Sequence, residues 1–218
     1  MSEEVKTIYL CLAHMSEEGY EQKYVKEAFD TNWVVPMGPN VYTFEQNLAD
    51  FSNANLDGSK LDRKVVCLSA GTAAVHLALI ACGVQLGDEV CVQSFTFCAS
   101  SHPITYLGAK PVFIDSEKET WNMDPELLEK AIIDRKEKTG KYPKAIIPVA
   151  LYGMPYDCER IMVIADKYGI PVIEDAAEGM GSRYNGQVLG TFGRFGVLSF
   201  NGNKMITTSG GGALICRS

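Results

Sequence analysis

A lysine near the end of the 218-residue sequence stands in an unusual neighbourhood. Lys204 follows the run Ser-Phe-Asn-Gly-Asn, has the apolar Met205 and Ile206 directly after it, and precedes Thr-Thr-Ser-Gly-Gly-Gly at 207–212. An isolated lysine usually faces water. In an apolar pocket, however, its pKa falls and the amine becomes a nucleophile for carbonyl groups. Lys204 is therefore a candidate for covalent chemistry with a carbonyl compound.

A second candidate is a turn of small residues between a predicted strand and a predicted helix. It consists of Ser69, Ala70, Gly71 and Thr72. Small side chains let the backbone approach an anion closely, and a helix N-terminus offers free N–H groups and a positive dipole end. A tight strand–helix turn without a ligand explains this segment equally well when it is taken alone.

The third candidate is a pair of carboxylates at the end of a predicted strand. Glu174 and Asp175 follow an apolar Val-Ile pair and precede Ala-Ala and then Glu178. Asp115, which also follows a predicted strand, is expected to be a cap or turn residue. An anion-binding turn, an acid and a lysine on one sheet form the set that pyridoxal phosphate (PLP) needs for its phosphate, its pyridinium nitrogen and its Schiff base.

The elements that would position these residues alternate along the chain. Hydrophobic spacing and turn residues predict helices at 17–30, 44–51, 72–82, 99–107, 125–138 and 158–168, and strands at 65–68, 90–92, 111–114, 145–149, 172–173 and 210–218. The strands are uniformly apolar, which indicates burial on both faces. We therefore expect an α/β fold with a mostly parallel central sheet flanked by helices, whose ligands sit at the carboxyl ends of the strands.

Composition narrows the classes of function. The net charge is −7 and no block of Lys or Arg occurs, which argues against nucleic-acid and anionic-membrane partners. No apolar run approaches the roughly 20 residues that span a bilayer, and the acidic residues 1–4 lack the order of a signal peptide. The seven cysteines form no C-x-x-C pair, so we expect buried thiols in a reducing cytoplasm and no metal site.

Several ordered segments resemble one family. The strongest are Ser-Ala-Gly-Thr at 69–72, Gly-Ala-Lys-Pro-Val-Phe-Ile-Asp at 108–115, Leu-Tyr-Gly at 151–153, Glu-Asp-Ala-Ala-Glu at 174–178 and Asn-Gly-Asn-Lys at 201–204. Over essentially its whole length the chain resembles the DegT/DnrJ/EryC1/StrS sugar aminotransferases, which have the type I PLP-dependent aminotransferase fold. Within the family, the segment Asn-Gly-Asn-Lys at 201–204 with Thr-Thr-Ser-Gly-Gly-Gly at 207–212, and residues 32–39, look most like bacterial transaminases that make UDP-4-amino-4,6-dideoxy-N-acetylglucosamine for surface glycans.

The resemblance assigns catalytic roles by position. Lys204 matches the lysine that forms the Schiff base and then moves a proton, and Asp175 matches the acid that pairs with the pyridine nitrogen. Phe97 matches the aromatic residue that stacks on the cofactor ring. Glu178 matches a polar position on the side of the cofactor's hydroxyl group, where other members carry Gln or His.

The resemblance also assigns a phosphate cradle. Ala70, Gly71 and Thr72 match its backbone and hydroxyl ligands, together with the hydroxyl of Ser199. Asn201 is expected to contact the phosphate or anchor the backbone nearby.

The resemblance implies a reaction and a domain arrangement. We expect amino transfer, with L-glutamate as donor, to a keto carbon, C4, of a UDP-linked 4-keto-6-deoxy-N-acetylhexosamine, in a cytoplasmic homodimer. Residues 1–40 would form an N-terminal helix and active-site loop, and 41–218 the PLP-binding large domain. The smaller C-terminal domain of the family is expected to be absent, so that the 218-residue form binds PLP weakly and shows no turnover.

Two alternatives stay open at this point. A related PLP-dependent sugar dehydratase carries His at the lysine position, which Lys204 argues against. A non-catalytic α/β fragment of such an enzyme is compatible with the same motifs. A dinucleotide-binding domain is disfavoured because no G-x-G-x-x-G follows the first strand.

Overall fold

The computed structural model describes residues 14–217, so the acidic residues 1–4 and the first part of the predicted segment 1–40 lie outside the described residues. The helices are α1 (Tyr20–Asp30), α2 (Pro39–Asn53), α3 (Gly71–Ala81), α4 (His102–Tyr106), α5 (Pro125–Thr139) and α6 (Cys158–Tyr168), with short 3₁₀ turns at Cys98–Ser100 and Leu151–Gly153. The strands are β1 (Arg63–Leu68), β2 (Glu89–Gln93), β3 (Lys110–Ile114), β4 (Ala145–Ile147), β5 (Ile173–Asp175), β6 (Arg183–Tyr184), β7 (Gln187–Val188), β8 (Phe195–Ser199) and β9 (Gly212–Arg217).

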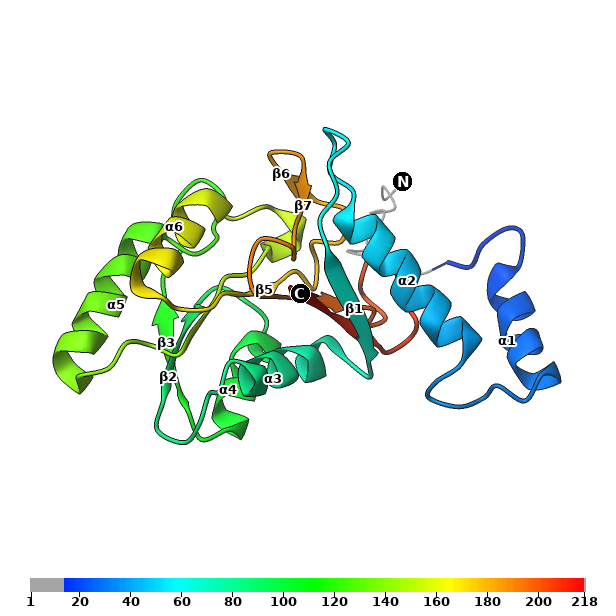
Figure 1. The fold of residues 1–218 in the computed structure, drawn as a ribbon, viewed down its shortest axis with the longest axis horizontal. Coiled ribbons are helices and arrows are strands. Elements are labelled where there is room, and N and C mark those ends of the chain that lie inside the picture. Colours follow the sequence, from blue (N-terminus) through cyan, green and yellow to red (C-terminus); the bar gives the residue numbers. More distant parts are fainter. Residues whose placement is uncertain (1–13, 218) are drawn as a thin grey trace, which may run out of the picture.

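The main strands form one twisted, mostly parallel layer, as predicted (Figure 1). One part has the order β1-β9-β8-β5 and the other the order β3-β2-β4. Two parallel bridges, Ile146 to Val172 and Val149 to Asp175, join them between β4 and β5. Strand β9 is antiparallel to both of its neighbours, and every other pairing in this layer is parallel.

Helices cover both faces of the sheet, and each face has its own apolar core. Alternate residues of a strand point to opposite faces. Ile146 of β4 therefore packs with α5 and α6, whereas Ile147 packs with α3 and α4. This double burial explains why the strands read as continuous apolar runs.

Three local features differ from the sequence-based expectation. The helix predicted at 99–107 is divided into a 3₁₀ turn, Cys98–Ser100, and α4, because Pro103 has no N–H to continue the first turn and instead suits the start of a second one. The strand β8 and the hairpin of β6 and β7 were not predicted. The second helix begins earlier than expected, at Pro39, after Gly38 with a φ of 117°.

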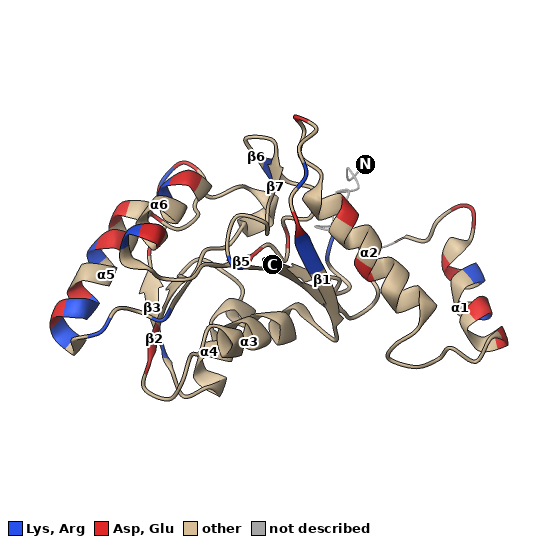
Figure 2. Ribbon diagram, viewed as in Figure 1, with Lys and Arg blue, Asp and Glu red and all other residues tan. Residues whose placement is uncertain are grey.

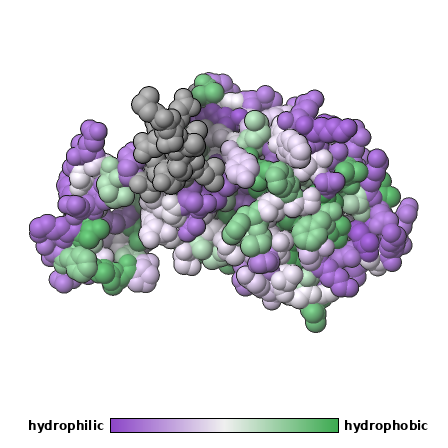
Figure 3. All heavy atoms as spheres, turned by 180° about the vertical axis from the view of Figure 1, so that it is seen from behind, coloured by the Kyte–Doolittle hydropathy of each residue, from purple (hydrophilic) through white to green (hydrophobic). Residues whose placement is uncertain are grey.

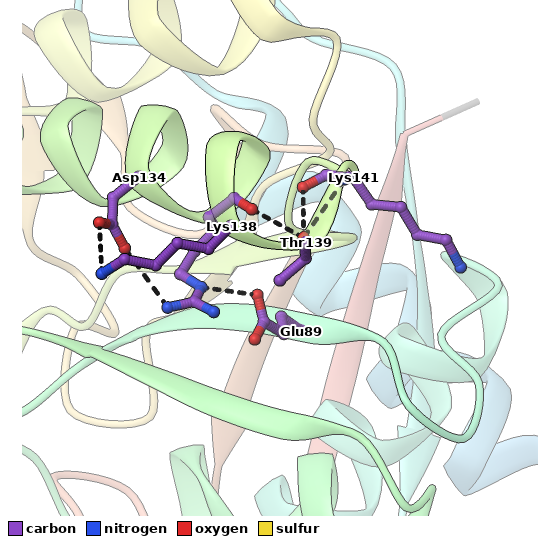
Figure 4. Close-up of polar contacts among 6 residues, drawn as sticks. Glu89, Asp134, Lys138, Thr139 and Lys141 are labelled. Atoms are coloured by element: carbon purple, nitrogen blue, oxygen red, sulfur yellow. Dashed lines mark hydrogen bonds and ion pairs between the residues drawn. The ribbon is translucent and has the colours of Figure 1, made fainter.

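Charged side chains are unevenly distributed over the helices (Figure 2). Helix α5 carries many of both signs, and its Arg135 donates to Glu89 at the start of β2 with an Nε–Oε2 distance of 2.9 Å. Figure 4 shows Glu89 below the end of α5, where Thr139 Oγ1 accepts from the Lys141 backbone N–H at 3.2 Å. The Arg135–Glu89 contact joins α5 to β2, whereas the Thr139–Lys141 contact closes the end of the helix.

The N-terminal helix α1 lies apart from the body and buries none of its residues (Figure 1). Its apolar side chains Tyr20, Tyr24, Val25 and Phe29 are exposed, and apolar atoms also gather on the central surface seen from behind (Figure 3). Among residues 14–217, no helix combines the length and the apolar character needed to cross a membrane.

Gly212 at the start of β9 provides the closest backbone approach next to the predicted site. A Cβ at this position would lie 2.4 Å from Ala70 C and from Gly71 N. The approach places β9 against the start of α3, so a side chain here would displace the helix N-terminus.

We predict that Gly212→Ala lowers the free energy of unfolding by about 1–3 kcal/mol, because an added methyl group overpacks a filled space. Gly210→Ala is the matched control, since a Cβ at that position has no heavy atom within 4 Å. Chemical denaturation of both variants measures the difference. Equal stabilities would contradict the close approach.

Candidate active site

The nine predicted site residues line one cavity of about 790 Å³. It opens at the carboxyl ends of β1, β5 and β8, where ligands of open α/β sheets usually sit. The nine are Ala70, Gly71, Thr72, Phe97, Asp175, Glu178, Ser199, Asn201 and Lys204. The structure thus brings them together from four separate segments, and the individual roles given to them stay predictions.

The N-terminus of α3 lines the cavity and is suited to bind an anion. Ala70 is its N-cap in an extended conformation, no side chain caps the helix, and no acidic residue occupies its first turn. Such a terminus leaves N–H groups without an intrahelical partner. Ser199 lies beside it, because a Cβ built on Gly71 would lie 3.0 Å from Ser199 Cβ. Free N–H groups, a dipole end and an adjacent hydroxyl suit a phosphate.

Asp175 is a buried carboxylate at the end of β5, with only 6% of its surface exposed. Its Oδ2 accepts from Ser100 Oγ at 2.6 Å, and its Oδ1 accepts from the Ala177 N–H at 3.2 Å. Burial is the main influence and raises the pKa of Asp175, whereas the two hydrogen bonds and the positive charge of Lys204 oppose this rise and the charge of Glu178 adds to it. A cation beside this carboxylate would therefore be strongly favoured.

Lys204 is held inside the cavity by a carboxylate. Its side chain is 13% exposed, and its Nζ lies 3.3 Å from Glu178 Oε1. The other oxygen of Glu178 accepts from the Tyr152 N–H at 2.7 Å. Tyr152 has a φ of 51°, an uncommon conformation for a non-glycine residue, so the Glu178 carboxylate links the lysine to a strained turn.

Phe97 and Asn201 occupy more open positions on the wall of the cavity. The Phe97 side chain is 74% exposed, so its ring has a face available for stacking. Asn201 donates from Nδ2 to Asn203 Oδ1 at 3.0 Å and its carbonyl accepts from the Lys204 N–H at 2.9 Å. In this structure Asn201 therefore shapes the loop that carries Lys204.

Glu174 and Asp115 lie outside this cavity. Glu174 is fully buried on the opposite face of β5, where its two oxygens accept from the N–H groups of Gly190 at 3.0 Å and Gly193 at 2.6 Å. Burial raises the pKa of Glu174, and these hydrogen bonds oppose the rise. Asp115 accepts from the Ser116 N–H at 2.8 Å, which is the turn role expected for it.

Sequence reasoning missed three residues that support the site. Thr96 and Ser100 form a chain of hydroxyls behind Asp175, and Tyr152 supplies the N–H that holds Glu178. Single hydroxyl residues in a loop have no distinctive spacing. The only signal for Tyr152 was its place in the Leu-Tyr-Gly segment at 151–153.

These residues fit pyridoxal phosphate. The uncapped start of α3 matches a phosphate, Asp175 is a buried acid for a ring nitrogen, and the Lys204 amine lies within the same cavity. The Phe97 ring is exposed enough to contact a planar ligand.

Comparison with known proteins places the chain in a family. A sequence model of the DegT/DnrJ/EryC1/StrS aminotransferase family matches residues 15–218, and the chain belongs to this family. EpsN of Bacillus subtilis (strain 168), classed as a pyridoxal phosphate-dependent aminotransferase, is 51% identical over 210 residues, covering 96% of this chain and 51% of EpsN. The GDP-perosamine synthase of Escherichia coli O157:H7 is 39% identical over 207 residues, covering 95% of this chain and 53% of that enzyme.

A solved structure supports the same assignment. The PLP form of Spr1654 from Streptococcus pneumoniae, classed as a sugar aminotransferase, superposes with a TM-score of 0.80 at 29% identity, over 98% of this chain and 54% of that one. The predicted family, fold and cofactor class are confirmed by these matches. The chain spans about half the length of the relatives it matches.

The burial of Asp175 gives a pH-dependent prediction. When the pKa of an acid is higher in the folded state than in the unfolded state, the protein loses stability as the pH rises from the ordinary pKa, 3.8 for Asp, through the folded-state pKa. Asp175→Asn removes this loss and keeps an acceptor for Ser100. We predict that the variant gains stability relative to the parent as the pH rises, measured without cofactor by denaturant unfolding at several pH values. A difference that stays constant with pH would contradict a raised pKa.

Proposed function

We propose that the protein is a PLP-dependent sugar aminotransferase that transfers an amino group to the keto carbon of a nucleotide-linked sugar. One observation carries this proposal: Lys204, Asp175 and the uncapped N-terminus of α3 converge on one cavity in a chain that belongs to an aminotransferase family. When bound, PLP supplies an aldehyde for amines and a ring that withdraws electrons.

The residues of this chain would divide the work as follows. The first-turn N–H groups at Gly71 and Thr72, with the Ser199 hydroxyl, bind the phosphate. Asp175 holds a proton on the ring nitrogen, because an adjacent carboxylate favours the cationic form. Lys204 takes and returns a proton through Nζ at the sugar carbon that gains the amine.

Two other residues orient these groups. Phe97 covers one face of the cofactor ring. Glu178 already contacts Lys204 Nζ at 3.3 Å, and this contact keeps the amine inside the cavity.

The finer part of the proposal concerns the substrates and the assembly. The motifs at 32–39 and 201–212 favour a UDP-linked 4-keto-6-deoxy-N-acetylhexosamine aminated at C4, with L-glutamate as donor, for surface polysaccharide or glycan synthesis in the cytoplasm. A homodimer is proposed with it, supported by the exposed apolar side chains of α1. Residues 41–218 would be the PLP-binding large domain, with 1–40 as the N-terminal helix and active-site loop.

A sugar dehydratase is the second candidate from the same fold. The lysine at 204 disfavours it, since the family's dehydratases were expected to carry His there. The presence of an amine in the product separates the two reactions.

Amination assays test the substrate proposal. The protein, extended to the length of its relatives and loaded with PLP, is incubated with L-glutamate and UDP-linked or GDP-linked 4-keto-6-deoxy sugars, and the products are analysed by mass spectrometry and NMR. We expect nitrogen at C4 of the UDP-linked N-acetylhexosamine. Amination at C3, or only of the GDP-linked sugar, would overturn the finer assignment while leaving the reaction class intact.

Covalent labelling tests the role of Lys204. Borohydride reduction of the PLP-loaded protein should leave the cofactor mass on the peptide that contains Lys204, and Lys204→Ala should abolish amination. Lys144→Ala serves as a control at a lysine outside the cavity lining. Labelling of any other lysine in the parent protein would refute the assignment.

A further inference from the structure

A chain of hydroxyl groups supports Asp175 from behind. Ser100 is 1% exposed and lies in the 3₁₀ turn Cys98–Ser100. Its Oγ lies 2.6 Å from Asp175 Oδ2 and 2.8 Å from Thr96 Oγ1. Thr96 lines the cavity, whereas Ser100 is not among the lining residues. The chain of hydroxyl groups therefore runs from the cavity wall at Thr96 to Oδ2 of Asp175.

Which group donates in each of these hydrogen bonds follows from the number of hydroxyl protons available. An ionised carboxylate only accepts, so Ser100 must donate its single hydroxyl proton to Asp175. Ser100 then has none left for Thr96, although the distance alone allows either atom to donate. Thr96 must therefore donate to Ser100, and each bond polarises the next toward the carboxylate.

The local geometry points to a positioning role: we propose that Ser100, supported by Thr96, keeps the buried Asp175 carboxylate ionised and fixed in orientation for a cationic ring nitrogen. Neither hydroxyl is assigned to the site by the motifs. Each would act through Asp175 and not by contact with the reacting atoms.

The charged groups around Asp175 act in opposite directions on its ionisation, so stabilising the ionised form falls to the hydroxyl groups of Ser100 and Thr96. Lys204 favours the ionised form, but Glu178 opposes it from the same cavity and also pairs with Lys204. Glu174 faces the other side of β5 and is satisfied there by Gly190 and Gly193. Of the hydrogen bonds to the Asp175 side chain, the one from Ser100 is shorter, at 2.6 Å, than the 3.2 Å bond from Ala177.

The first test uses the protein without cofactor and is independent of the proposed function. Ser100→Ala removes the donor to Oδ2, so burial raises the pKa of Asp175 further. The folded state then holds its proton to higher pH, and the stability deficit of the variant grows as the pH rises. In an Asp175→Asn background this growth should vanish. A purely structural role for Ser100 predicts a deficit that is independent of pH in both backgrounds, and that result would overturn the proposal.

The second test rests on the proposed function and measures PLP affinity by titration of the cofactor's absorbance, with parent and variants extended to the length of the relatives. Loss of a hydrogen bond to a charged group should weaken PLP binding by roughly ten- to a hundredfold in Ser100→Ala. Thr96→Val keeps the shape of the side chain while it removes the bond to Ser100, and it should weaken PLP binding by about two- to tenfold. The neighbouring Ser101, whose hydroxyl donates to the Cys98 carbonyl, provides the control Ser101→Ala, expected to bind as the parent does.

The outcomes separate the two proposals. If the parent binds no PLP, the proposed function fails, and the cofactor-free titration still decides the role of Ser100. If the parent binds PLP and Ser100→Ala binds it equally well, the positioning role fails while the proposed function stands. If Ser101→Ala weakened PLP binding as much as Ser100→Ala, the positioning role would also be refuted, because the lost affinity would then come from a change in the loop and not from the hydroxyl chain.

Discussion

The burial of one carboxylate at the end of β5 is the constraint on which the rest of the site depends. Asp175 is nearly inaccessible, and an ionised group in such a place needs charge or hydrogen bonds to compensate for lost water. Ser100 and Ala177 supply two such bonds, and Lys204 supplies a positive charge. Each of these partners comes from a different loop. The groups that compensate for the burial of Asp175 therefore come from segments of the chain that are up to about a hundred residues apart.

The order of the strands makes that meeting possible. The parallel strands β1, β5 and β8 all end at the same edge of the sheet, and they deliver the start of α3, Asp175 and Ser199 to it. The antiparallel β9 lies between β1 and β8, where Gly212 allows the start of α3 to come close to the sheet. On the opposite face of β5, Glu174 fixes the turn that leads into β8. The cavity is thus a product of strand order, close approach and one buried, hydrogen-bonded carboxylate on each face of β5.

Much of this arrangement could be predicted from the sequence, and the limits have physical causes. Uniformly apolar strands and helix boundaries indicated the covered, mostly parallel sheet, and the residue types at strand ends indicated where its cavity lies. The direction of β9 could not be predicted, because local sequence carries no record of which strand will be its neighbour. The strand β8 was missed because Gly196 and Ser199 interrupt its short run, which therefore lacks the uniform apolar pattern of the predicted strands. Ser100 was missed because its importance arises from a contact with Asp175 across 75 positions of the chain, and Thr96 was missed because it contacts Asp175 only through Ser100.

The absorption spectrum of the protein with PLP tests the central claim most directly. The claim is that the cavity around Lys204 and Asp175 performs both halves of an amino transfer, so the cofactor must change state with the donor and return with the acceptor. The account predicts that L-glutamate removes the visible absorbance of the bound cofactor and that a UDP-linked 4-keto-6-deoxy sugar restores it, in the protein extended to the length of its relatives. A bound cofactor whose spectrum responds to neither compound would contradict the account.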